Sequence, residues 1–121
     1  MKVGIVGSRR FKDRAGVERL VSTLAAGDVL VSGGCRGVDS WAEKAAIRRG
    51  LSRLVFEPDL AGVRNRGEAA RRYFERNRKI AEASDVLHAF VTRDRTGGTE
   101  NTIMHMRELG KQIILHYEGL N

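Results

Sequence analysis

The chain has 121 residues, of which 41% are hydrophobic and 31% are charged. This balance excludes a disordered chain, and the length fits one domain, which we expect to cover residues 1–121. The formal net charge of +7 favours anionic partners such as phosphates, either free or in a polymer.

Nothing in the sequence predicts a membrane protein or a secreted one. The apolar runs are all shorter than the ~20 residues that span a bilayer, and residues 1–7 are too short and glycine-rich for the core of a signal peptide. Cys35 is the only cysteine, which excludes an intramolecular disulfide. We therefore expect a cytoplasmic protein without a membrane partner.

The first half of the chain reads as two strands, each followed by a helix. Residues 2–6 are apolar and partly β-branched and end at Gly7, which predicts a buried strand. Asp13 can cap a helix that reaches about residue 26. A second strand at 29–31 runs into a glycine-rich segment, after which Val38 or Asp39 opens a helix that Gly50 stops.

The second half continues the alternation. We expect a strand at 53–56, a loop at 60–67, an arginine-rich helix at 68–83 and a strand at 85–91. Thr99 then caps a helix that reaches Leu109, and the last strand is at 112–116.

Strands that alternate with helices form parallel sheets with right-handed crossovers, and uniformly apolar strands are typical of sheets that are covered on both faces. The sequence therefore predicts an α/β fold, a Rossmann-like three-layer sandwich with a five-stranded, mainly parallel sheet and a central first strand. Ligands of such folds bind at the carboxyl edge of the sheet.

Three of the expected strands are followed by loops of similar composition. Each combines glycine, a hydroxyl group and arginine: Gly7-Ser8-Arg9-Arg10, Ser32-Gly33-Gly34-Cys35-Arg36-Gly37 and Arg95-Thr96-Gly97-Gly98-Thr99. Glycine lets backbone N–H groups approach an anion, helix N-termini attract negative charge, and arginine can bind two phosphate oxygens. The alternative interpretation is that these glycines only make tight turns. A P-loop motif is absent, and the glycine spacing is not that of a dinucleotide-binding loop.

These motifs together resemble the SLOG superfamily, which unites the DNA-processing protein DprA/SMF with the LOG cytokinin-activating enzymes. The resemblance rests on three segments: Gly7-Ser8-Arg9, the segment from Val31 to Asp39, and Gly97-Gly98-Thr99-Glu100. The chain looks most similar to the small stand-alone YspA/cpYpsA-related members. The resemblance implies a Rossmann-like fold, a nucleotide or nucleotide-derived ligand and a homo-oligomer.

The resemblance also raises the question of catalysis, because the enzymes of this group cleave the bond between a base and ribose 5′-phosphate. Their arginine corresponds to Arg76, which precedes Asp85 by nine residues. Their catalytic glutamate, however, corresponds to Thr102, and Glu100 lies two residues away. Arg76 and Glu100 are thus the candidate catalytic residues, while the departure at Thr102 argues against hydrolysis.

The expected ligand-binding residues follow from the loops and the resemblance: Gly7, Ser8, Arg9, Ser32, Gly33, Gly34, Arg36, Gly37, Asp39, Arg76, Asn77, Gly97, Gly98 and Thr99. Asp39 either contacts a ribose hydroxyl or caps a helix. The histidines lack metal-ligand spacing, so we expect neither a metal nor a cofactor.

Three functions remain open. The first is a binding domain, or sensor, for a nucleotide-derived phosphate ligand. The second is a nucleoside 5′-monophosphate phosphoribohydrolase. The third is DprA-like binding to nucleic acid, which the charge favours and the aromatic content of 6% disfavours because few rings are left for stacking bases. We expect any such binding to be weak.

Overall fold

The computed structural model describes residues 1–118, and residues 119–121 of the expected domain lie outside the described part. The elements follow in the order β1 (Lys2–Gly7), α1 (Arg14–Ser22), β2 (Val29–Ser32), α2 (Val38–Arg49), β3 (Ser52–Val55), α3 (Arg66–Ala83), β4 (Val86–Val91), α4 (Gly98–Glu108) and β5 (Gln112–Tyr117).

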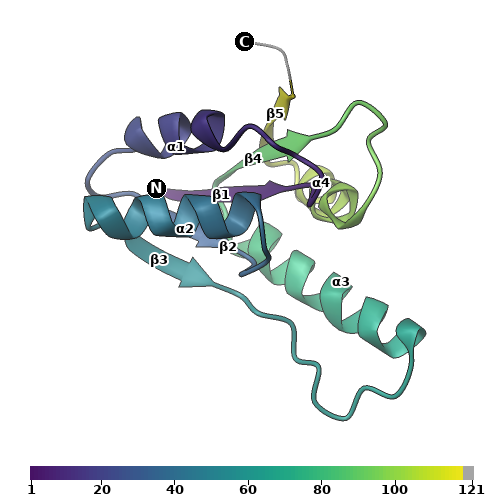
Figure 1. Ribbon diagram of the computed structural model, residues 1–121. Coiled ribbons are helices and arrows are strands. Elements are labelled where there is room, and N and C mark those ends of the chain that lie inside the picture. Colours follow the sequence, from purple (N-terminus) through teal and green to yellow (C-terminus); the bar gives the residue numbers. More distant parts are fainter. Residues whose placement is uncertain (119–121) are drawn as a thin grey trace.

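The five strands form one sheet in the order β3-β2-β1-β4-β5, and every neighbouring pair is parallel. The strand β1 is central, with Ile5 beside His88 of β4. The predicted fold is therefore confirmed: a Rossmann-like α/β sheet with helices on both faces (Figure 1).

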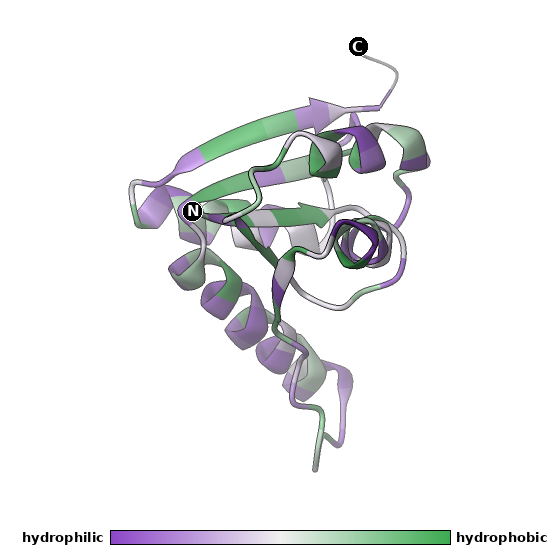
Figure 2. Cartoon of the chain, turned by 90° about the vertical axis from the view of Figure 1, so that its left-hand side faces the viewer, coloured by the Kyte–Doolittle hydropathy of each residue, from purple (hydrophilic) through white to green (hydrophobic). Residues whose placement is uncertain are grey.

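Two apolar cores lie on opposite faces of the sheet. Val3 and Ile5 of β1 pack in the core that includes buried residues of α1 and α2, whereas Val6 packs in the core with Ile80 of α3 and Ile103 of α4. Successive side chains of a strand point to opposite faces, so an uninterrupted apolar run can fill both cores. Figure 2 shows this pattern as green strands between helices of mixed colour.

Three helix ends lie away from their predicted positions. The helix α4 begins at Gly98 with Gly97 as its N-cap, so Thr99 lies in the first turn and does not cap the helix. The helix α1 ends at Ser22 instead of near residue 26, because the Thr23 backbone and hydroxyl both bond to the Leu20 carbonyl. The helix α3 begins at Arg66, two residues before Glu68, because the Asn65 side chain caps it by accepting from the Glu68 N–H at 2.9 Å.

The helix α3 is the longest in the described chain, with 18 residues, and its first half extends beyond the sheet (Figure 1). It therefore forms one side of the carboxyl edge, where β1 and β4 also end. No helix within residues 1–118 is both long and apolar enough to cross a membrane.

Candidate functional site

A cavity of about 560 Å³ lies at the carboxyl edge of the sheet. Most of its lining comes from three parts of the chain: the end of β1 with the loop after it, the inner side of α3, and the β4–α4 loop with the first turns of α4. Cys35 and Asp39 complete the lining. The volume is in the range of small-molecule sites.

Nine of the residues predicted from the sequence line this cavity: Gly7, Ser8, Arg9, Asp39, Arg76, Asn77, Gly97, Gly98 and Thr99. The structure thus brings together the first loop, the arginine-asparagine pair of α3 and the start of α4, which are up to 92 positions apart in the sequence.

Arg76 and Asn77 connect two loops at the bottom of the site. Both are buried, with 7% and 5% of their surface exposed. Arg76 donates hydrogen bonds to the Gly33 carbonyl, to Cys35 Sγ at 3.5 Å and to Asn77 Oδ1 at 2.9 Å. Asn77 in turn donates to the Gly98 carbonyl at 3.4 Å. The pair therefore joins the β2–α2 loop to the N-terminus of α4.

Asp39 holds the β2–α2 loop in shape. It lies in the first turn of α2, is 5% exposed, and accepts hydrogen bonds from the backbone N–H groups of Gly33 at 3.1 Å and Cys35 at 3.3 Å. Burial raises the pKa of Asp39 to about 6, although these hydrogen bonds and the charge of Arg76 act in the opposite direction. Asp39 does not cap α2, because no side chain makes a cap hydrogen bond at that helix. Its contact with a ribose remains a prediction.

Apart from Cys35, the β2–α2 loop does not line the cavity. Of the predicted residues, Ser32, Gly33, Gly34, Arg36 and Gly37 lie outside the lining. The Ser32 hydroxyl donates to Glu43 at 2.6 Å, and Arg76 covers Gly33. Gly34 has a φ of +71°, which an L side chain rarely adopts. This loop acts as the support of the site.

The N-terminus of α4 opens toward the cavity without a side-chain cap. Gly97 precedes the helix with a φ of +104°, and no side chain bonds to the first N–H groups. Gly97, Gly98 and Thr99 all line the cavity, as does Thr102 one turn further on. Uncapped N–H groups at the positive end of a helix are suited to bind an anion.

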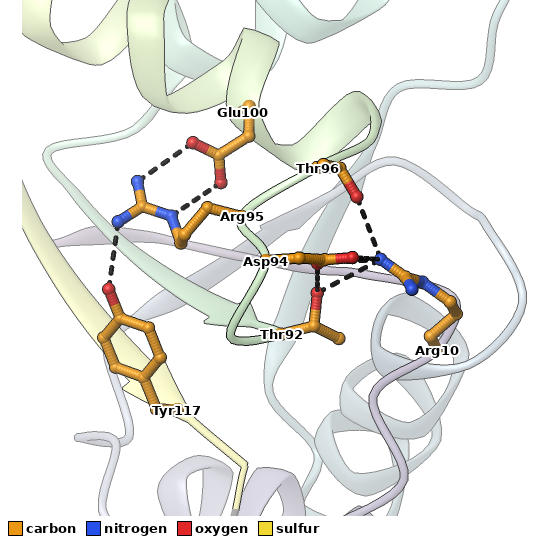
Figure 3. Close-up of polar contacts among 7 residues, drawn as sticks. All are labelled: Arg10, Thr92, Asp94, Arg95, Thr96, Glu100 and Tyr117. Atoms are coloured by element: carbon orange, nitrogen blue, oxygen red, sulfur yellow. Dashed lines mark hydrogen bonds and ion pairs between the residues drawn. The ribbon is translucent and has the colours of Figure 1, made fainter.

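Glu100 does not line the cavity, although it lies in the same helical turn. Its two carboxylate oxygens accept hydrogen bonds from Arg95 at 2.8 and 2.9 Å, and Arg95 also donates to the Tyr117 hydroxyl at 3.0 Å (Figure 3). The bonds to Glu100 and Tyr117 raise the pKa of Arg95. We name these three residues the Arg95 clasp. It fastens the β4–α4 loop to the edge strand β5.

A second cluster crosses the rim of the cavity. Arg10, from the loop after β1, donates to both oxygens of Asp94 at 2.6 and 2.8 Å and to Thr96 at 2.9 Å (Figure 3). The hydrogen bonds from Arg10 and Thr92 lower the pKa of Asp94 to about 2. Arg10 is therefore neutralised by Asp94, whereas its neighbour Arg9 is exposed at the rim and makes no ion pair within residues 1–118.

Sequence reasoning missed the apolar part of the lining. Ala70, Tyr73 and Phe74 line the cavity, and so does Ile80. The available signal was their spacing, because positions 70, 73, 74, 77 and 80 share one side of a helix with Asn77. The density of arginines around them instead favoured a solvated helix.

The described residues contain no cluster of three or more His, Cys, Asp or Glu side chains that could hold a metal ion. The polar groups that line the site include cationic side chains, backbone N–H groups, hydroxyl groups, the Cys35 thiol and the carboxylates of Asp39 and Asp94.

Two comparisons with known proteins both find a likeness to DprA. Residues 1–57 match the family model of DNA recombination-mediator protein A. The chain also resembles the X-ray structure of DNA processing protein A (DprA) from Streptococcus pneumoniae, with a TM-score of 0.77 and 21% sequence identity over 94% of this chain. No curated protein sequence matches it significantly.

This chain covers 49% of that DprA chain, or about half its length. The structural match shows a shared fold, and the family match covers the part of the chain that holds β1, β2 and the loops after them. Together the two findings support the predicted likeness to the superfamily that includes DprA/SMF.

Proposed function

We propose that the chain binds a nucleotide or nucleotide-derived phosphate ligand in the cavity at the carboxyl edge of the sheet. The observation that carries this proposal is the uncapped N-terminus of α4, which lines the same cavity as the buried Arg76 and Asn77.

The charges around the cavity suit an anion. The helix N-terminus contributes roughly half a positive charge, and the hydrogen-bond acceptors of Arg76 are a carbonyl, a thiol and an amide rather than a carboxylate. Arg9 adds a second cation at the rim. Neither arginine makes an ion pair within residues 1–118, although the Asp39 carboxylate also lines the cavity and interacts with the charge of Arg76.

Arg9 provides the sharpest test, because it is exposed and its removal leaves the fold intact. We expect at least one of AMP, GMP, CMP and UMP to bind the wild type in isothermal calorimetry, and Arg9→Gln to bind that nucleotide about tenfold more weakly, or ~1.4 kcal/mol. Arg107→Gln, at an exposed position on α4 outside the cavity lining, is the matched control and should bind like the wild type. A wild type that binds none of the four at millimolar concentration refutes the proposal.

Nucleic-acid binding is the second candidate function. It is supported by the name of the matching family, by the likeness to DprA and by the net charge of +7. The cavity favours the smaller ligand, because its volume of about 560 Å³ is in the range of small-molecule sites. Phosphoribohydrolase activity has less support, since Thr102 lines the cavity and Glu100 does not.

A further inference from the structure

Two aromatic side chains stand where the first half of α3 borders the cavity. Tyr73 and Phe74 both line it, and Phe74 keeps 48% of its surface exposed. This part of α3 extends beyond the sheet (Figure 1), so neither core requires a large apolar ring there. Ala70, which has a small side chain, lines the cavity beside them.

The Tyr73 ring is held in place from within the site. The Arg76 guanidinium lies over it, 5.6 Å from the ring centre, and Arg76 is itself fixed by the Gly33 carbonyl and Asn77. A ring held by a cation–π contact loses little freedom when a flat ligand stacks beside it. Tyr73 is therefore preorganised, and Phe74 supplies an exposed apolar surface next to it.

The aromatic side chains and the anion-binding groups occupy different positions along α3. Asn77 contacts the Gly98 carbonyl at the N-terminus of α4. Tyr73 and Phe74 lie about one helical turn earlier, a rise of roughly 5 Å along the helix axis. A ligand that reaches both must carry an anion at one end and a flat aromatic group about the length of a sugar away.

We propose that Tyr73 and Phe74 form a base-stacking wall, so that the ligand is a mononucleotide whose base lies against α3 and whose phosphate lies at the N-terminus of α4. This inference rests on the proposed function and adds to it a requirement for the base. Ribose 5-phosphate, which carries the same phosphate and sugar without a base, should bind much more weakly.

The experiment measures the affinities of ribose 5-phosphate and of the tightest of the four mononucleotides by calorimetry. Removing a ring that stacks on a base typically weakens binding by about 5- to 100-fold. We expect a loss in this range for the mononucleotide in Phe74→Ala, no change for ribose 5-phosphate, and recovery of mononucleotide affinity in Phe74→Trp. Alanine is the best helix former, so the variant keeps α3. Leu109→Ala, at a residue that is equally exposed at 48% and outside the cavity lining, is the matched control.

The outcomes separate the inference from the function on which it rests. If neither the mononucleotides nor ribose 5-phosphate bind, the proposed function itself fails. If ribose 5-phosphate binds the wild type as tightly as the mononucleotide, or Phe74→Ala binds the mononucleotide like the wild type, the site takes phosphates but the stacking wall is refuted. A wild type that is a dimer by light scattering and becomes a monomer in Phe74→Ala would show that a second copy occupies the wall, which also overturns the inference.

Discussion

Glycine is required at position 33 because the neighbouring side chains leave no room for a Cβ, and not because of its backbone conformation. A Cβ at this position would lie 2.7 Å from Arg76 Nη1 and 3.1 Å from Asp39 Oδ2. Both side chains are buried, and Arg76 is bonded to the Gly33 carbonyl, so neither can move aside freely.

We therefore expect Gly33→Ala to lower the free energy of unfolding by about 1–3 kcal/mol, the usual range for overpacking. Thermal unfolding followed by circular dichroism measures it. Gly27→Ala is the control, because an added Cβ there has no atom within 4 Å and the backbone is not left-handed. Equal melting temperatures for the two variants would contradict the tight contact.

His88 should make folding less stable in acid. Burial and the neighbouring His116, whose Nε2 lies 2.9 Å from His88 Nδ1, lower the pKa of His88 from 6.5 to about 4. Between these values the unfolded chain binds a proton that the folded chain does not, so this contribution to stability falls as the pH falls from 6.5 to 4. Urea unfolding at pH 4.5, 5.5 and 6.5 should show that His88→Gln has lost this slope.

Asp39 has the opposite effect on the pH dependence of stability, over nearly the same pH range. Its pKa is raised from 3.8 to about 6, so the folded chain holds a proton that the unfolded chain has lost, and this contribution to stability falls as the pH rises from 4 to 6. Asp39→Asn keeps an oxygen acceptor but removes the titration. In the same urea series, we expect the stability of Asp39→Asn to fall more steeply toward acid than that of the wild type. The stability of His88→Gln should fall less steeply, because His116, whose pKa burial also lowers, still contributes in the acid direction. Identical slopes in the two variants would refute both assignments.

Thr102 is the residue that argues against hydrolysis. Cleavage at a ribose C1′ passes through a cationic sugar, which a carboxylate stabilises and a neutral hydroxyl does not. Thr102 is 1% exposed and lines the cavity, while the Glu100 carboxylate is bound by Arg95. We expect no release of free base from AMP above the buffer rate, by chromatography, in the wild type or in Glu100→Gln. Turnover in the wild type that Glu100→Gln abolishes would establish Glu100 as catalytic.

At the scale of elements, the Arg95 clasp sets the position of the α4 N-terminus. Arg95 has a φ of +53°, which is unfavourable for a residue other than glycine. Its bonds to Glu100 and Tyr117 offset that cost and connect the loop to β5. The loop that presents Gly97 and Gly98 to the cavity is thereby held by an edge strand outside the site.

Glu100→Gln should therefore speed hydrogen exchange at the amides of residues 95 and 100, which donate to the Thr92 and Gly97 carbonyls. It should also reduce stability by about 1–2 kcal/mol, since hydrogen bonds to a charged group contribute ~1.5–3 kcal/mol and the pair is partly solvated. Glu82→Gln is the matched control, because the Arg78–Glu82 pair is 62% and 57% exposed and such pairs contribute little. Unchanged exchange rates in Glu100→Gln would show that the loop is held by other contacts.

At the scale of the whole molecule, the net charge of +7 attracts any polyanion. We expect single-stranded DNA to bind weakly and without sequence preference, with an affinity that falls steeply between about 50 and 200 mM salt as counterions are released. Fluorescence anisotropy with two oligonucleotides of equal length and different sequence measures both properties. Tight, sequence-selective binding that salt does not weaken would make DNA binding, and not mononucleotide binding, the better supported function.

The sequence by itself determined the order of the elements, the parallel sheet with β1 at its centre and the edge at which the glycine-rich loops meet. These follow from apolar runs, helix caps and turn residues, which are local patterns, and from the limited ways in which alternating strands and helices can connect. Of the helix ends that were misplaced, those at Ser22 and Arg66 depend on local capping bonds, whereas α4 begins at Gly98 without a side-chain cap.

Only the tertiary structure decided which of the predicted residues face the cavity and which further residues line it with them. Gly33 and Arg76 are 43 positions apart, and their contact exists because α3 packs across the end of β2. The pairing of Glu100 with Arg95 and Tyr117 needs β5 beside β4. The wall of Tyr73 and Phe74 needs α3 to extend past the sheet. Side-chain direction depends on how layers pack, and packing joins residues that no local pattern relates.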